Sequence, residues 1–547
     1  MKRTNYLYII SIIAFLITSC KKDFLEGAPY SFTTVENFYK TAADAELGLA
    51  GCYNVLNAGS AQGEDIGIFH RQMPYMVAGS TDENLNRDGF ASPIYTPLGL
   101  ASWNSQTEYI QQVYLGLYVG VNRCNTLLAN VDGIEMDATR KKEVIAEATF
   151  LRGLYYYYLG MLYGGVPVFT TIPQDGTQAR QSLKEVFTQV IKDFDLAYQD
   201  LPNRAKTFAG RANKWSAAGF LAKTYAYLGS SKLNGNGADL NFALNSFDWV
   251  DATDMYAKAK VLTTAIIAGS GYMLTPKYDY LFRENNCNKF KYDECLFVVE
   301  SAASAIGNQN IYIDAFIPMG NRELVGGGTA RLTPLGELYR KYHATDFRRD
   351  WNITGNLAAT AITENVEGDN YYVPAKANLT RAIYNAKFRY RDPKVKAPLF
   401  PTANSDGNYP VLRYADVLLI HAEAIYYTAN DATLARTFLS QVRKRALIAP
   451  ATTTTVLDAA YRKTDFVQEL LDERSRELCM ETQRHFDLAR FGRYTAAINS
   501  LSGDKTVGWF NTAVPVLQAN WKPYRVWFPI PLTELSLNRN LVQNPGY

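Results

Sequence analysis

The fold is decided by a stretch at Asn213–Gly229, which reads NKWSAAGFLAKTYAYLG. Its larger and smaller apolar side chains recur at helical spacing. One side of the predicted helix carries Trp215, Ala218, Leu221, Ala222, Tyr225 and Leu228. Alanine and glycine beside these side chains allow a second helix to approach closely, because the distance between helix axes depends on side-chain size. The stretch therefore predicts a helix that packs tightly against neighbouring helices.

Helical patterns also occur on both sides of this stretch. Paired helices with alanine at their crossing points are typical of tetratricopeptide-like units, although Trp215, Ala218 and Gly219 match the W-x-x-L-G pattern only loosely. We predict helices at 35–58, 108–130, 139–162, 181–200, 211–230, 253–269, 411–429, 431–446 and 464–490. The glycines of YGGVPV should end the third of these helices, and the tyrosine run 155–158 should pack in the core.

Residues 271–410 have a different composition, rich in Asn, Gly, Thr and Tyr. We expect loops there and short strands such as ECLFVVE (294–300) and NIYIDAF (310–316). The predicted fold is therefore mainly α, with tetratricopeptide-like helix pairs and an irregular, loop-rich lobe that faces a ligand.

The N-terminus has the pattern of an export signal. Two basic residues precede an apolar run at 7–17, which is shorter than the roughly 17–25 residues that cross a bilayer. Ile17, Thr18 and Ser19 lead into Cys20, a sequence that resembles a bacterial lipobox. We predict that residues 1–19 are a signal peptide and that Cys20 carries a lipid anchor. The alternative is a free cysteine near an ordinary cleavage site.

Composition excludes several classes of protein. The chain has 547 residues, too many for one ordinary core. Its formal charge of +3 falls to +1 without residues 1–19, which hold Lys2 and Arg3 and no acid, so nothing favours nucleic acid. Beyond Cys20 there are five cysteines and no CxxC pair, which argues against a disulfide scaffold. The four histidines lack metal-ligand spacing, and HExxH, GxSxG and P-loop motifs are absent from the sequence, so we expect no metal and no cofactor.

Four segments together carry a family resemblance. They are ATFLRGLYYYYLGMLYGGVPVF (148–169), YPVLRYADVLLIHAEAIYY (409–427), LLDERSRELCMETQRHFDLARFGRY (470–494) and VWFPIPLTELSLNRNLVQNPGY (526–547). In order and spacing they resemble the SusD/RagB family, the surface glycan-binding lipoproteins of Bacteroidetes-type bacteria. Members often carry glycine where this chain has Thr482, which we place on a helix surface. We divide the mature chain into an N-terminal helical part, 20–230, and a C-terminal SusD/RagB part, 231–547, packed as one unit.

The resemblance implies a binding protein and not an enzyme. Such a protein is anchored by lipid to the outer membrane, faces the cell exterior, captures oligosaccharides and passes them to a SusC-like TonB-dependent transporter. Capture of peptides or glycopeptides, as in RagB-like systems, is an alternative. A second alternative is a secreted glycoside hydrolase, in which Glu473 and Glu477 would be the catalytic carboxylates. Residues four apart on one helix point the same way and do not face each other across a sugar.

Charged residues in the second and third segments suggest ion pairs between helices. Arg413 and Asp416 are three apart and can pair on one helix face. Glu473, Glu477 and Glu481 are spaced by four beside leucines, so we predict partly buried networks in which each charge has a structural role.

We expect the ligand site among aromatic and polar residues in loops. Glycine-rich segment 79–106 combines hydrogen-bonding groups with rings, and a tryptophan exposed in a polar loop would be unusual without a ligand. The candidate ligand-binding residues are Trp103, Asp82, Asn84, Arg87, Tyr95 and Trp351. Local packing is the alternative for Trp103. Trp249, before a helix, is a weaker candidate, and Trp351 lies beside Asp346 and Arg348, which we interpret as a structural ion pair.

Overall fold

The computed structural model describes residues 38–58, 67–86, 92–203, 210–283, 293–301, 331–355, 363–366, 369–372, 376–388, 408–447, 455–502 and 510–547. Helices dominate these residues. The first half contains α3 (Ala42–Asn54), η3 (Ile68–Gln72), α4 (Met73–Ala78), α5 (Tyr95–Gly99), α6 (Glu108–Asn130), η4 (Val131–Gly133), α7 (Ala138–Tyr163), α8 (Leu183–Asp200), α9 (Lys214–Leu233), η5 (Ala238–Leu240), η6 (Ala243–Asn245), α10 (Ala252–Gly269) and η7 (Tyr278–Leu281).

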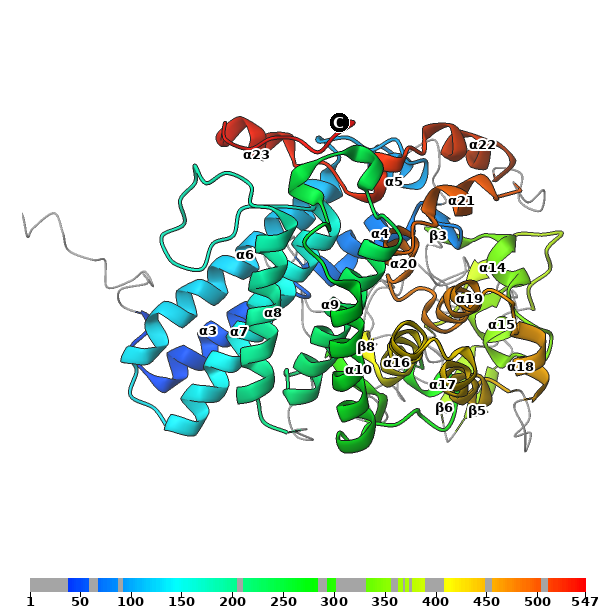
Figure 1. Ribbon diagram of the computed structural model, residues 1–547, viewed down its shortest axis with the longest axis horizontal. Helices are drawn as coiled ribbons and strands as arrows, with labels where there is room; N and C mark the ends of the chain where they lie inside the picture. The colour runs from blue at the N-terminus through cyan, green and yellow to red at the C-terminus, as the bar shows by residue number, and fades with distance from the viewer. Residues whose placement is uncertain are drawn as a thin grey trace, which may run out of the picture.

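Shorter helices make up most of the second half. They are α14 (Gly336–Arg340), α15 (Phe347–Asn352), α16 (Tyr414–Ala429), α17 (Ala432–Arg445), α18 (Thr455–Tyr461), α19 (Phe466–Leu478), α20 (Arg484–Arg490), α21 (Tyr494–Asn499), α22 (Phe510–Asn520), η8 (Pro523–Val526) and α23 (Leu532–Leu537). Figure 1 shows α3, α6, α7 and α8 on one side, α16 to α19 on the other, and α23 and the C-terminus along the upper edge.

The described chain contains four antiparallel two-stranded sheets, of which β1–β3 and β2–β8 join segments more than 100 residues apart. The pairs are β1 (Asn84–Asn86) with β3 (Leu332–Pro334), β2 (Cys295–Val299) with β8 (Tyr409–Arg413), β4 (Ile353–Thr354) with β7 (Tyr384–Asn385), and β5 (Thr363–Val366) with β6 (Asp369–Tyr372). The predicted strand in ECLFVVE is confirmed as β2, whereas NIYIDAF lies outside the described residues.

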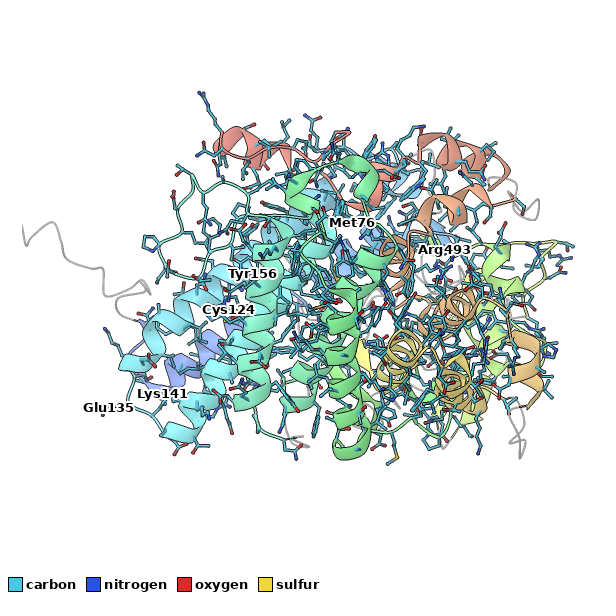
Figure 2. The ribbon with its side chains drawn as sticks, viewed as in Figure 1. Met76, Cys124, Glu135, Lys141, Tyr156 and Arg493 are labelled. Atoms are coloured by element: carbon cyan, nitrogen blue, oxygen red, sulfur yellow. The ribbon has the colours of Figure 1, made fainter. Side chains whose placement is uncertain are left out.

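Consecutive helices pack side by side, from α6 through α7, α8 and α9 to α10, and on to α16 and α17. Figure 2 shows Cys124 and Tyr156 within this layer and Glu135 and Lys141 at its far end. Glycines permit the close approach: a Cβ at Gly120 of α6 would lie 2.5 Å from the ring of Tyr155 in α7, and one at Gly229 of α9 would lie 2.9 Å from the ring of Tyr256 in α10. The prediction of a mainly α fold with closely paired helices is confirmed.

Local sequence explains where these helices begin and end. Capping boxes formed by Ser182 with Glu185 and by Asn213 with Ser216 start α8 and α9. Helix α7 ends at Gly164, whose φ of +81° is readily accessible only to glycine, so the predicted stop at YGGVPV is confirmed. The tyrosine run 155–158 is buried, as predicted.

The predicted helix 464–490 is wrong as a single element. The chain forms α19 and α20 with a break at 479–483, where Met480 and Thr482 have left-handed φ angles of +63° and +59°. A continuous right-handed helix cannot contain these angles. Thr482 therefore lies in a turn and not on a helix surface, in a conformation that glycine adopts most easily.

One apolar core runs through both halves of the described chain, from Ala45 to Leu541. Helix α9 continues across the predicted boundary at 230/231. The C-terminal segment packs on the N-terminal half: Leu532 N–H donates to the carbonyl of Ser105 over 2.9 Å. The division at 230/231 remains a prediction. Helix α9 contributes residues to both predicted parts, and the two parts share one apolar core.

Candidate functional site

Trp103 lies in the core, so the expectation of an exposed tryptophan is wrong. Its side chain is 1% exposed, and its Nε1–H donates to the hydroxyl of Tyr547 over 2.8 Å. The rings of Phe528 and Trp521 lie 5.1 and 6.5 Å away, and the Arg525 guanidinium lies 5.1 Å from the Trp103 ring. Trp103 lies in a polar loop, and it is buried because the C-terminal segment covers its ring.

Asp82 belongs to a buried charged cluster. Its carboxylate accepts two hydrogen bonds of 2.7 Å from Arg484 and one of 2.9 Å from Lys341. Burial alone would raise the pKa of Asp82, but these two cations outweigh it and lower that pKa. Beside it Glu83 accepts a 2.6 Å hydrogen bond from Ser475, and burial raises the pKa of Glu83 to about 7.

Asn84 and Tyr95 are also buried, with partners inside the protein. Asn84, in β1, accepts a 2.8 Å hydrogen bond from the side chain of Asn385. The hydroxyl of Tyr95 lies 3.2 Å from that of Tyr109. These contacts hold β1 and α5 against the core.

Trp351 is 3% exposed, and its Nε1–H donates to the carbonyl of Lys387 over 2.9 Å. The predicted ion pair between Asp346 and Arg348 is confirmed at 2.8 Å, with both side chains fully buried. Trp249 is partly buried and donates to the carbonyl of Ser246. A ligand role for Trp351 stays a prediction that would require the site to open.

The same holds for four other candidates, because buried side chains do not reach a ligand in this conformation. They are Asp82, Asn84, Tyr95 and Trp103. Cys20 and Arg87 lie outside the described residues, and their predicted roles in lipidation and ligand binding remain predictions. The segment singled out from the sequence therefore contributes structural contacts in its described part.

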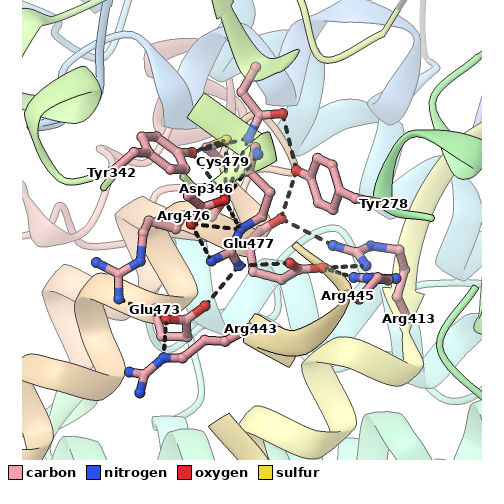
Figure 3. A network of polar contacts seen from close by, with 12 residues as sticks. Tyr278, Tyr342, Asp346, Arg413, Arg443, Arg445, Glu473, Arg476, Glu477 and Cys479 are labelled. Atoms are coloured by element: carbon pink, nitrogen blue, oxygen red, sulfur yellow. Dashed lines mark hydrogen bonds and ion pairs between the residues drawn. The ribbon is translucent and has the colours of Figure 1, made fainter. Parts of the chain in front are cut away.

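A buried ionic network occupies the second half of the protein (Figure 3). Arg413 sits at the end of β8 and contacts Glu481 at 2.7 Å, Glu294 at 2.6 Å and Glu477 at 3.1 Å. The predicted networks between elements are confirmed. The expected pair of Arg413 with Asp416 is wrong, because Arg413 precedes α16 and its side chain turns toward α19.

Asp416 instead joins α16 to two other helices. Its carboxylate lies 2.7 Å from Lys223 of α9 and 2.7 Å from Arg474 of α19. Burial would raise the pKa of Asp416, but these cations outweigh it and lower that pKa. Glu423, two turns later, pairs with Arg490 of α20 at 2.6 Å.

The two carboxylates considered for glycosidic catalysis are fully buried. Glu473 contacts Arg443 and Arg476 at 2.9 and 2.7 Å, and Glu477 contacts Arg348 and Arg413 at 3.0 and 3.1 Å. Burial opposes ionisation of Glu477, yet the arginines, with Arg445 foremost, lower its pKa to about 2. A general acid needs a proton near neutral pH and access to the sugar, and neither side chain meets these conditions.

Two cavities stand out in the part of the chain that the structure describes. One, of about 380 Å³, lies in the connection between α9 and α10, at 231–248. The other, of about 220 Å³, lies between α17 and α18 and includes Arg436, Arg443 and Asp458. Sequence reasoning did not single out either. The Asn- and Gly-rich run NGNGADLN at 234–241 was a signal for the first.

Over the described ranges, the structure contains no group of three or more His, Cys, Asp or Glu side chains arranged to hold a metal ion. Among the same described residues, no helix combines the length and the apolar composition that a membrane crossing needs. The four described cysteines, Cys52, Cys124, Cys295 and Cys479, are buried free thiols.

Comparisons with known proteins cover almost the whole chain. The profile of the SusD family matches residues 244–547, and one described as "Starch-binding associating with outer membrane" matches residues 23–226. A SusD-like protein of Formosa agariphila is 24% identical, with 98% of this chain and 99% of its own covered. The starch-binding protein SusD of Bacteroides thetaiotaomicron is 25% identical, with 98% of each covered.

Solved structures share the fold. A SusD homolog from Bacteroides thetaiotaomicron superposes with a TM-score of 0.71 at 21% identity, covering 94% of this chain and 99% of its own. The surface glycan-binding protein A of the same species, in complex with laminarihexaose, gives a TM-score of 0.67 at 17% identity, covering 92% and 100%. At these identities the similarity concerns the fold alone.

Proposed function

The chain belongs to the SusD/RagB family, and from this premise we propose that it captures oligosaccharides at the cell surface for a SusC-like TonB-dependent transporter. The observation that carries the proposal is the match of nearly the whole chain to proteins whose names state starch or glycan binding. Binding of this kind needs no cofactor, and shape with a few placed polar groups is sufficient.

The described carboxylates support a binding role over hydrolysis. Glu473 and Glu477 are buried and held ionised by arginines, so they can neither donate a proton to a glycosidic oxygen nor reach it. Capture of peptides or glycopeptides remains the second candidate, since it would use the same fold with other ligand chemistry.

Calorimetric titration of the soluble chain from Lys21 onward tests the function directly. Plant, host and microbial glycans and a peptide panel are titrated separately, and each mixture is checked for cleavage. Heat of binding with the glycan intact supports capture and names the substrate class. Cleaved glycan would overturn the proposal in favour of a hydrolase, and heat with peptides alone would assign the protein to peptide uptake.

The anchor and the partner require cell experiments. We propose that Cys20 carries the lipid on the exterior face of the outer membrane. Cys20→Ser should move the protein from the membrane to the soluble fraction, while Ser19→Ala, which keeps the cysteine, should not. Co-purification of the full-length protein with the transporter from detergent-solubilised membranes tests the partnership, and its absence under conditions that preserve glycan binding would contradict it.

A further inference from the structure

The connection between α9 and α10 forms a concave feature of the surface. It lies near the C-terminal segment at the upper edge of the molecule (Figure 1). The cavity measures about 380 Å³, near the lower end of the range for small-ligand sites. Its lining includes Ser231, Asn236, Phe242, Ala243, Ser246 and Asp248.

The wall of the cavity is held in place by the rest of the protein. Gly237 has φ +68°, and a Cβ there would lie 2.2 Å from the ring of Trp527, so the backbone rests directly on the C-terminal segment. Asn245 accepts a 2.8 Å hydrogen bond from the Gly165 N–H. The Arg180 guanidinium lies 5.4 Å from the centre of the Phe242 ring. Such a wall is preformed, which reduces the entropic cost of binding.

Asn236 provides an unused hydrogen-bond acceptor. The residue is 5% exposed; its Nδ2 makes a long contact of 3.4 Å with Ser231 Oγ, and its Oδ1 has no donor among the described residues. An acceptor buried without a donor lowers the stability of the folded protein. A ligand hydroxyl that donates to this oxygen would remove the cost, with a small rotation of the amide to open access.

The remaining groups favour an uncharged, hydroxylated ligand. Lys232 and Asp248, which both line the cavity, pair at 3.1 Å, so their charges offset each other. Ser246 Oγ donates to Asp248 over 2.8 Å, which leaves hydroxyl and carboxylate oxygens as acceptors. Phe242 adds a ring, and a sugar combines hydroxyls with an apolar C–H face that suits one.

We propose that this cavity, at 231–248, is a glycan subsite that takes one neutral sugar ring. The inference rests on the proposed oligosaccharide capture and adds a location and a ligand chemistry to it. The ring would donate a hydroxyl hydrogen to Asn236 Oδ1 and place its other hydroxyls against Ser246 and Asp248.

Filling the cavity tests the subsite. Ala243 is exposed and lines it, so Ala243→Phe should occupy the space while removing no interaction; Ala268→Phe, on an exposed part of α10 outside the cavity, is the matched control. Wild type and both variants are titrated with the glycan that the panel identifies, with hydrogen exchange followed at 231–248. We expect about tenfold weaker binding and lost ligand protection in Ala243→Phe alone.

Asn236→Leu separates binding from folding. The side chains are similar in size and the removed oxygen has no donor, but the amide nitrogen also loses its contacts with Ser231 and Tyr227. We therefore expect a small loss of thermal stability, while glycan affinity falls about fivefold. Unchanged affinity in both cavity variants, or ligand protection elsewhere but not at 231–248, would overturn the subsite and leave glycan capture standing. A wild-type protein that binds no glycan would overturn the proposed function and this inference together.

Discussion

At the scale of one residue, Trp103 shows that a residue's type and its neighbours in sequence do not determine whether its side chain is buried. Polar residues flank it at Ser102 and Asn104, yet its ring is buried and its indole N–H donates to Tyr547, which lies 444 positions along the chain. Asp82 behaves alike, since Arg484 neutralises it from a distant helix. A residue chosen for surface chemistry can therefore be a structural residue when a remote segment covers it.

Trp103→Ala should destabilise the protein by about 3–5 kcal/mol, because it removes a large buried ring and leaves a cavity. Trp249→Ala, at a partly buried position, should cost clearly less. Urea denaturation of both variants measures the difference. Equal, small losses with weakened glycan binding in Trp103→Ala would restore the interpretation of Trp103 as a ligand residue.

Glu83 should make stability depend on pH near neutrality. Burial raises its pKa from 4.5 to about 7, so between these values the folded protein holds a proton that the unfolded chain releases. The free energy of unfolding therefore falls as pH rises through this window. Glu83→Gln cannot ionise, and relative to wild type its free energy of unfolding should rise by on the order of 2 kcal/mol from pH 5 to pH 8.

Denaturation curves of the two proteins at matched pH values measure this difference. The pKa of Asp82 is lowered, so its stabilising contribution is lost only in acid, below the window, and in both proteins alike. Parallel curves from pH 5 to pH 8 would show that Glu83 is ionised throughout.

At the scale of elements, buried ion pairs connect helices and strands that are not joined by backbone hydrogen bonds. Arg413 connects the end of β8 to α19, and Asp416 connects α16 to α9 and α19. In the break between α19 and α20, the hydroxyl of Thr482 accepts a 3.0 Å hydrogen bond from the hydroxyl of Tyr409. Buried ion pairs therefore link helices and strands whose individual sequence patterns do not specify their partners.

Arg413→Ala should lower the free energy of unfolding by about 3–5 kcal/mol, since it leaves Glu294, Glu477 and Glu481 with fewer cations in a buried site. The control is Arg493→Ala, which removes a half-exposed pair with Asp465 at 3.5 Å and should cost less than about 1 kcal/mol. Thermal unfolding of both variants compares the two effects. A melting temperature equal to wild type in Arg413→Ala would contradict a structural role for the network.

At the scale of the whole molecule, the C-terminal segment binds the two halves together. Asn544 donates to the carbonyls of Tyr163 and Phe528 over 2.9 and 2.7 Å and accepts from Arg180 over 2.7 Å. Leu532 N–H donates to the Ser105 carbonyl, and Trp103 contacts Tyr547. The described halves share one core, so we expect them to unfold together.

Asn544→Ala should destabilise the protein by about 2–3 kcal/mol, because several buried donors and acceptors lose their partner at once. Asn540→Ala, at an exposed position that donates to the Thr177 carbonyl, should cost less than about 1 kcal/mol. Differential scanning calorimetry gives the size of the effect and the number of transitions. Two separate transitions in the wild-type protein would contradict a single packed unit.

The sequence by itself determined the helical class, most helix positions, the strand at 295–299, the burial of the tyrosine run and the family, because helical period, caps and motif spacing are local in the chain. Only the tertiary structure decided the break at 479–483, the partners of Arg413 and Asp416, the burial of Trp103 and Asp82, and the cavity at 231–248. Burial and charge pairing depend on segments hundreds of residues apart, and no local pattern records which distant segment will cover a side chain.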